Sequence, residues 1–147
     1  MTYNRITLRG YVGRDPELWY VSPTAPIARF PLATDGDGRL SEDGKSYRPG
    51  RVTEWHTIYC QYRLAETADA SVFKGLLVEV EGRLAYTTIY RPGREPRKVA
   101  YIVADRLKTL TEDRLEDLTP EEERPNNPYG DYIDYLGKAA GEDDYPF

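Results

Sequence analysis

The chain of 147 residues contains very few of the residues that usually carry catalysis, metal binding or covalent cross-linking. It has one cysteine, Cys60, and one histidine, His56. A single cysteine excludes an internal disulfide, so we expect a reducing compartment, and one cysteine with one histidine is too few for a zinc cluster. Glu79 and Glu81 share a strand face, but they lack the further acidic partners that a two-metal nuclease needs. The sequence therefore predicts a protein that is not an enzyme and holds no metal or cofactor.

Long apolar runs are also missing. No stretch approaches the roughly 18 consecutive apolar residues that a membrane-spanning helix requires, and the N-terminus lacks the apolar region of a signal peptide. The sequence thus predicts a soluble, cytoplasmic protein with no membrane partner.

Charge is unevenly distributed along the chain. Residues 1–110 contain 17 Lys and Arg against 13 Asp and Glu, a net of +4, whereas residues 111–147 contain 3 against 12, a net of −9. A basic body joined to an acidic tail is typical of a protein with a polyanionic partner or an interaction tail. The opposite charges also suggest that the tail competes with such a polyanion for the body.

The body has the pattern of short strands. In residues 3–12, Ile6 and Leu8 alternate with polar neighbours, which is the period of a half-buried strand, and Gly10 indicates a bulge or a close backbone approach. The Ala-rich residues 64–73 predict one short helix. The predicted strands are residues 3–12, 27–34, 53–62, 76–90 and 98–110.

Two basic segments separate these strands. Residues 35–52 are predicted to form a mobile loop or a long hairpin, and residues 91–98 a loop. Five strands with a helix between the third and fourth favour an all-β fold, namely a five-stranded Greek-key barrel of the OB type with a disordered acidic C-terminal tail.

The chain divides into three parts. Residues 1–111 are predicted to form the barrel domain and residues 112–141 a disordered acidic linker. A short helix at residues 111–118 is expected to cover the barrel end. Residues 142–147 end the chain with acidic residues followed by Tyr-Pro-Phe, which suits a small pocket rimmed by Lys or Arg on a partner protein. The alternative is a frayed, solubilising tail.

Residues 53–62 carry the first candidate binding groups. Trp55, Thr57, Tyr59 and Gln61 alternate onto one face of this strand. Trp55 and Tyr59 could form a platform on which bases stack, and stacking of this kind contributes roughly 1–3 kcal/mol per base without regard to base identity. The alternative is that both rings belong to the core.

Further aromatic and basic residues extend this candidate surface. Tyrosine is plentiful in the body, and its hydroxyl tolerates a wet groove. The arginines near the fourth strand could contact phosphates, and such binding would weaken steeply with salt. The additional candidates are Trp19, Tyr47, Tyr90, Arg83, Arg91, Arg94 and Arg97.

Several blocks of residues, taken together, resemble the bacterial single-stranded DNA-binding protein family. They keep the order of that family and cover residues 3–110 and the C-terminal tip. The blocks are Gly10–Leu18, Ala28–Phe30, Leu32–Thr34, Glu54–His56, Leu64–Glu66, Lys74–Gly75, Val80–Leu84 and Asp143–Phe147.

The resemblance implies an OB-fold homotetramer that is nucleoid-associated and acts in DNA replication, recombination and repair. It implies that Trp55 is the main stacking aromatic and that His56 lies at the oligomer interface. Basic residues at three positions match phosphate contacts of the family, namely Arg5, Arg63 and Lys74. The tip would recruit replication and repair proteins through Asp143, Asp144, Tyr145, Pro146 and Phe147.

The chain departs from the family at several aromatic positions. Gln61 and Ile89 stand where stacking aromatics are often found, and Tyr47 replaces a Trp. Trp19 occupies a position where Arg is common. The sequence therefore predicts a binder of single-stranded DNA that stacks bases on Trp55 and Tyr59. An OB-fold adaptor that binds protein and has little affinity for DNA is the alternative.

Overall fold

The computed structural model describes residues 1–111 and 114–123. Seven strands and one α-helix make up this part of the chain, so the predicted all-β class is confirmed. The elements are β1 (Ile6–Val12), β2 (Glu17–Tyr20), β3 (Pro26–Leu40), β4 (Tyr47–Gln61), α1 (Tyr62–Ser71), β5 (Leu77–Ile89), β6 (Arg97–Thr111), β7 (Arg114–Asp117) and a 3-10 turn (Glu121–Glu123).

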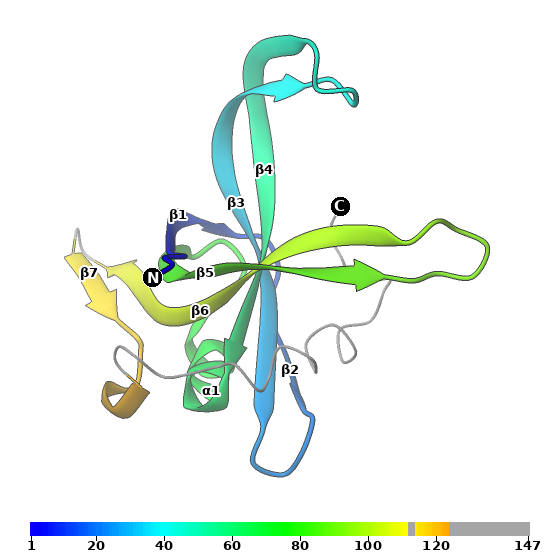
Figure 1. Ribbon diagram of the computed structural model, residues 1–147. Coiled ribbons are helices and arrows are strands. Elements are labelled where there is room, and N and C mark those ends of the chain that lie inside the picture. The colour runs from blue at the N-terminus through cyan, green and yellow to red at the C-terminus, as the bar shows by residue number, and fades with distance from the viewer. Residues whose placement is uncertain (112–113, 124–147) are drawn as a thin grey trace.

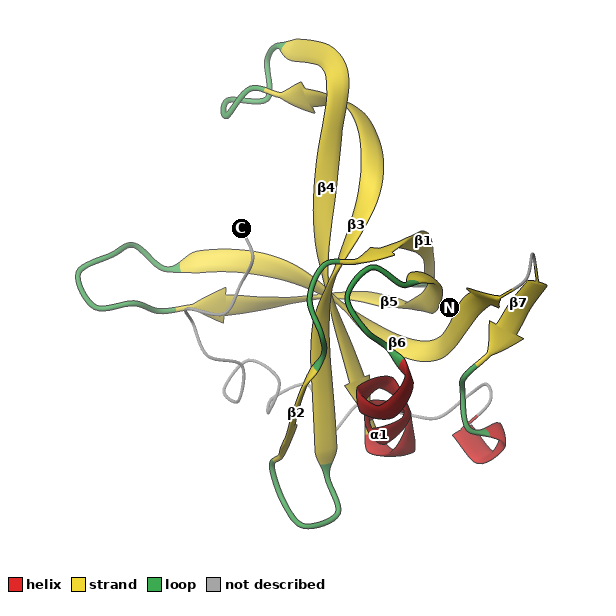
Figure 2. Cartoon of the chain, turned by 180° about the vertical axis from the view of Figure 1, so that it is seen from behind, coloured by secondary structure: helices red, strands yellow, loops and turns green. Residues whose placement is uncertain are grey.

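The sheet has the order β1-β5-β6-β4-β3-β2, and β1 also pairs with β3, which closes the barrel. The five predicted strands correspond to β1, β3, β4, β5 and β6, while the short strands β2 and β7 were not predicted. β4 and β6 pair in parallel through Ile58↔Ile102 and Tyr59↔Val103. The helix α1 follows β4 directly and packs at one end of the barrel (Figure 2). The five-stranded OB-fold barrel is therefore confirmed.

The barrel core consists of apolar side chains that alternate inward along the strands. Phe30, Leu32, Ile58, Val80 and Leu107 are all fully buried in it. No helix in the described part of the chain is long and apolar enough to cross a membrane.

Gly10 marks the point where β1 leaves β5 for β3. A Cβ at this residue would lie 2.1 Å from the carbonyl oxygen of Ala33, so no larger residue fits. The predicted close backbone approach at Gly10 is therefore confirmed.

Two long hairpins project from the barrel in different directions (Figure 1). β3 is buried from Pro26 to Leu32 and then becomes exposed, and β4 is buried only from Thr57 onward. Residues 35–52 therefore form the long hairpin that was one of the two predicted alternatives. The β5–β6 hairpin carries residues 91–96 at its tip.

The segment after β6 is folded, contrary to two predictions. β7 pairs with β6 through Lys108↔Asp117, so the predicted helix at residues 111–118 is wrong. Glu123 accepts the N–H groups of Arg63 (2.7 Å) and Leu64 (3.1 Å), and it thereby caps the first turn of α1. The folded domain thus extends to residue 123, and the predicted boundary at residue 111 is corrected. Residues 124–147, which include the predicted tip, lie outside the described residues.

Candidate nucleic-acid interface

The outer face of the sheet is the face turned away from the barrel core. Along β4, Ile58 and Cys60 point into the core, so the side chains of Trp55, Thr57, Tyr59 and Gln61 lie on the opposite, outer face. The strand registers extend this face onto β3, where Ala33, Pro31, Arg29 and Ile27 lie opposite these four residues in turn. One continuous surface thus carries the predicted stacking residues of β4.

Trp55 lies at the open end of the outer face and is 41% exposed. It lines a groove of about 490 Å³ that opens where β4 and β6 diverge, with Arg97, Lys98 and Tyr101 on the β6 side. Gly13 lies beneath the indole ring, because a Cβ at this residue would come within 2.4 Å of Trp55 Cζ3. An accessible ring therefore stands beside two cationic side chains, which suits a base and its phosphate.

Tyr59 does not fit the predicted role. It is 0% exposed, and its ring lies edge-on to the rings of Trp19 (6.5 Å between centroids) and Tyr101 (5.3 Å). The prediction that bases stack on Tyr59 is wrong, and the core alternative is correct for this ring. Aromatic neighbours from β2 and β6 bury it, and the alternation of β4 alone does not reveal them.

Trp19 is only half-buried, but its ring is already engaged. The guanidinium carbon of Arg29 lies 5.6 Å from the centroid of the Trp19 ring. Arg29 is 3% exposed and forms an ion pair with its cross-strand neighbour Glu17, with 3.0 Å between Arg29 Nη2 and Glu17 Oε2. The Trp19 ring is therefore part of an aromatic and cationic layer rather than an open platform.

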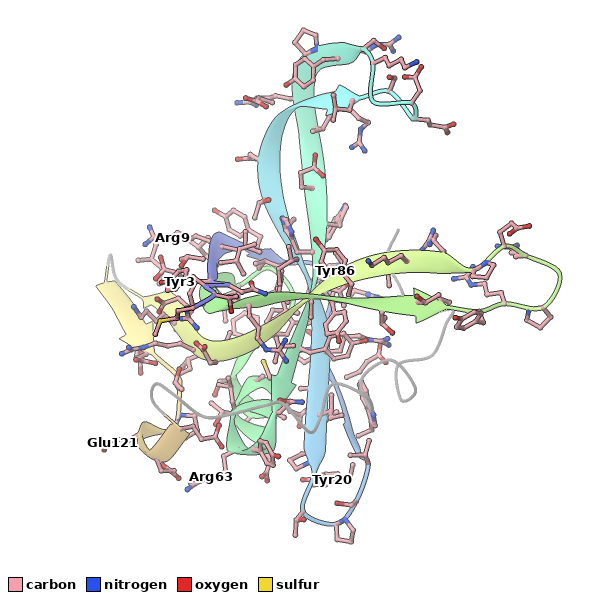
Figure 3. The ribbon with its side chains drawn as sticks, in the orientation of Figure 1. Tyr3, Arg9, Tyr20, Arg63, Tyr86 and Glu121 are labelled. Atoms are coloured by element: carbon pink, nitrogen blue, oxygen red, sulfur yellow. The ribbon has the colours of Figure 1, made fainter. Side chains whose placement is uncertain are left out.

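Two further predicted rings are exposed on the hairpins. Tyr47, 53% exposed, donates a hydrogen bond from its hydroxyl to Asp37 Oδ1 at 3.1 Å across the β3–β4 hairpin. Tyr90, 65% exposed, follows the last residue of β5. Tyr86 is also exposed, at the base of the β5–β6 hairpin, with Lys98 Nζ 5.0 Å from its ring centroid (Figure 3).

The predicted phosphate contacts fall into two groups. Arg91, Arg94 and Arg97 come together at the tip of the β5–β6 hairpin, around a small cavity of about 80 Å³. Arg97 also lines the groove beside Trp55. Arg83 is half-buried on the outer face of β5, opposite Val103.

The other three predicted cations lie apart from this cluster. Arg5 forms an ion pair with Asp105, and the hydrogen bond to that carboxylate raises the pKa of Arg5. Arg63, beside the 3-10 turn in Figure 3, forms an ion pair with Glu122. Lys74 is exposed, and within residues 1–111 and 114–123 no carboxylate pairs with its ammonium group.

His56 and Cys60 lie on the core-facing side of β4. His56 is half-buried, and its Nε2 lies 2.8 Å from Thr34 Oγ1. Burial lowers the pKa of His56 although Glu54 opposes this, so the ring is neutral at pH 7. Burial raises the pKa of the Cys60 thiol, which removes a reactive thiolate. Among the described residues, no group of three or more His, Cys, Asp or Glu is placed to hold a metal ion.

Comparison with known proteins shows the relationship of this chain. Residues 3–110 match the Single-strand binding protein family. The Single-stranded DNA-binding protein of Bacteroides thetaiotaomicron is 34% identical over 111 residues, which cover 76% of this chain and 68% of the relative. The Single-stranded DNA-binding protein of Neisseria meningitidis serogroup A is 36% identical over 111 residues, covering 75% of this chain and 61% of the relative.

A more distant relative and a solved structure agree with these matches. The mitochondrial Single-stranded DNA-binding protein of Oryctolagus cuniculus is 33% identical over 117 residues, covering 77% of this chain and 78% of the relative. The structure "Plasmodium falciparum SSB complex with ssDNA" superimposes with a TM-score of 0.63 at 23% identity, covering 76% of this chain and 97% of that chain, and shares the fold. The chain belongs to the single-strand binding protein family.

Proposed function

We propose that this protein binds single-stranded DNA of any sequence and that bases stack on Trp55. The observation that carries this proposal is the exposed Trp55 ring in a groove walled by Arg97 and Lys98. Every base has a π-face, so stacking tolerates any sequence, and the two cations can pair with the phosphates on either side. The names of the relatives, which describe proteins that bind single-stranded DNA, support the same function.

Tryptophan fluorescence tests the proposal. Titration with oligo-dT should quench the emission of a Trp19→Phe variant, in which Trp55 is the remaining tryptophan. A Trp55→Ala variant should lose about 1–3 kcal/mol of binding free energy while staying folded, which corresponds to a rise in Kd of roughly 5- to 150-fold. A flat titration with the intact protein contradicts DNA binding and favours the OB-fold adaptor.

The salt dependence of binding tests the cationic wall. Each phosphate contact contributes about −0.9 to −0.7 to the slope of log K against log salt concentration, the smaller value applying to single strands. Arg97→Ala should therefore weaken binding to all strands equally and make the slope less steep by roughly 0.7. Arg39→Ala, which removes an arginine from the β3–β4 hairpin, is the matched control. If both hairpins contact DNA, it should make the salt slope less steep independently of Arg97→Ala.

The remaining features of the proposal concern assembly and biological role. The protein acts without catalysis in DNA replication, recombination and repair, and it forms a homotetramer with His56 at an interface between copies. A half-buried, neutral imidazole suits such a position because it carries no charge to be desolvated. Mass measurement in solution tests the tetramer, and a monomer at micromolar concentration contradicts it.

The acidic segment from Asp143 to Phe147 recruits partner enzymes, and the acidic tail competes with DNA for the basic body. Because residues 114–123 are part of the fold, the informative truncation ends after Glu123. This truncated protein should bind oligo-dT more tightly than the full chain at low salt, and unchanged affinity contradicts the competition. Removal of Phe147 alone should abolish capture of a partner enzyme and leave DNA affinity nearly intact.

A further inference from the structure

The two faces of the β5–β6 hairpin differ in how far they are covered. Side chains alternate between these faces along each strand, and cross-strand partners share a face. Ala85, Ile89 and Val99 lie on the closed face and are only 8%, 6% and 6% exposed. Tyr86, which lies opposite Ala100, belongs to the open face and is 54% exposed. On this hairpin a base can therefore stack at the open face, on Tyr86, but not at the closed face.

The open face is a strip of exposed residues. Along β5, Thr88 and Tyr90 follow Tyr86 at alternate positions, and Tyr90 is 65% exposed. On β6, Ala100 lies opposite Tyr86, and its small side chain adds little cover to the ring. Lys98 is exposed and lies opposite Thr88. The strip thus presents two rings and one cation, and none of its side chains is a carboxylate.

Lys98 connects this strip with the groove beside Trp55. Its Nζ lies 5.0 Å from the centroid of the Tyr86 ring, a cation–π contact, and its side chain also lines the groove. Two neighbours of Tyr86 line the same groove, namely Ala100 opposite it and Leu84 two residues before it. A single strand with one base stacked on Trp55 can therefore continue along the groove to Tyr86, with its phosphates beside Lys98.

Charge favours this hairpin over the β3–β4 hairpin as the path of a polyanion. Residues 86–100 contain four Lys and Arg against one Glu, a net of +3. Residues 34–54 contain four Lys and Arg against five Asp and Glu, a net of −1. The exposed Tyr47 ring on the β3–β4 hairpin has the carboxylate of Asp37 at its hydroxyl, 3.1 Å away, and this charge repels a phosphate. A strand that leaves Trp55 is therefore attracted along the β5–β6 hairpin.

We propose that Tyr86 is a second stacking residue for single-stranded DNA, and that Lys98 pairs with the phosphates between the bases on Trp55 and Tyr86. Tyr90 lies four residues further along the strip, about 13 Å in an extended strand, so it takes a different base from Tyr86. The inference rests on the proposed function and adds a path to it. The DNA runs from Trp55 across the groove and onto the open face of the β5–β6 hairpin.

The test measures the affinity for oligo-dT by fluorescence anisotropy at several salt concentrations. Tyr86→Ala should raise the Kd about fivefold or more, the effect of losing one stacked base. It should leave the salt slope unchanged, because a stacked ring contacts no phosphate. Tyr86→Phe keeps the ring and should bind within about twofold of the intact protein. Lys98→Gln should make the salt slope less steep by roughly 0.7.

Tyr20→Ala is the matched control, because Tyr20 is 52% exposed on the β2–β3 hairpin, well away from Tyr86 (Figure 3). Its Kd should equal that of the intact protein. A smaller rise in Kd for Tyr86→Ala, or a rise as large for Tyr20→Ala, overturns the inference and leaves the proposed function intact. Failure of the intact protein to bind oligo-dT overturns the proposed function itself. The mass of Tyr86→Ala in solution should match that of the intact protein, and a smaller assembly assigns the ring to a contact between copies and overturns the inference.

Discussion

Replacing Glu123 with alanine tests whether the segment after β6 is part of the fold. The Glu123 carboxylate is 6% exposed and accepts two backbone N–H groups at the start of α1, at 2.7 and 3.1 Å. The N-cap residue Gln61 makes no side-chain capping bond of its own, so Glu123 supplies the cap from 62 residues away. The first turn of α1 therefore depends on a residue that the sequence places in an acidic linker.

The size of the effect follows from these two bonds. A hydrogen bond to a charged group contributes about 1.5–3 kcal/mol, and loss of a helix N-cap costs about 0.5–2 kcal/mol. Burial of the carboxylate offsets part of this gain, and it raises the pKa of Glu123 although the two N–H groups oppose it. We therefore expect Glu123→Ala to lower the free energy of unfolding by about 2 kcal/mol.

Urea denaturation followed by far-ultraviolet circular dichroism measures this change. Glu121→Ala is the matched control, because Glu121 has the same charge in the same turn but is exposed. The control should unfold within about 0.5 kcal/mol of the intact protein, as is usual for surface substitutions. If Glu123→Ala is no less stable than Glu121→Ala, the cap contributes nothing and the extended domain boundary loses its energetic basis.

Three further predictions use the same structure. Glu122→Gln should free Arg63 from its ion pair and raise the affinity for oligo-dT at low salt about two- to threefold, which is the size of a surface ion pair. Glu121→Gln should leave this affinity unchanged. Equal gains in the two variants refute a role for Arg63 in DNA binding. Burial holds the pKa of His56 below its usual 6.5, so the unfolded chain binds this proton at a higher pH than the folded protein does. The contribution of His56 to the free energy of unfolding should therefore be fully present above pH 6.5 and should decrease as the pH falls below that value. His56→Gln should flatten this pH dependence in urea titrations. Cys60 is fully buried with a raised pKa, so a thiol-specific reagent should modify it no faster than the protein unfolds, and rapid modification of the native protein contradicts this packing.

The strands were predictable from sequence because the alternation of apolar and polar residues shows which face of each strand is buried. Ile6 and Leu8 on β1, or Val78 and Val80 on β5, identify an inward face from neighbours two residues apart. The OB arrangement followed from the order of these strands and the single short helix. Local sequence patterns were sufficient to predict the buried face wherever the residues on the same strand determine it.

The predictions failed where the deciding neighbour is distant in sequence. Tyr59 shares its strand face with Trp55, but rings from Trp19 and Tyr101, about 40 residues away on either side, bury it. Residues 114–123 are polar and acidic, which is the composition of a linker. They fold because β6 offers β7 an edge for pairing and α1 offers Glu123 two N–H groups, and neither partner is visible in the local sequence.

The position at which β4 and β6 separate explains why one strand face serves two purposes. The two strands pair at Ile58↔Ile102 and Tyr59↔Val103, and each then follows its own hairpin. On the paired side Tyr59 is enclosed by the rings of neighbouring strands, whereas four residues earlier Trp55 faces the groove that the separation opens. Thr57 lies between these two environments, with its hydroxyl buried and its side chain at the groove. A shift of the separation by two residues toward the hairpin tips would place Trp55 where Thr57 is buried now, so the placement of the stacking ring depends on this short parallel contact.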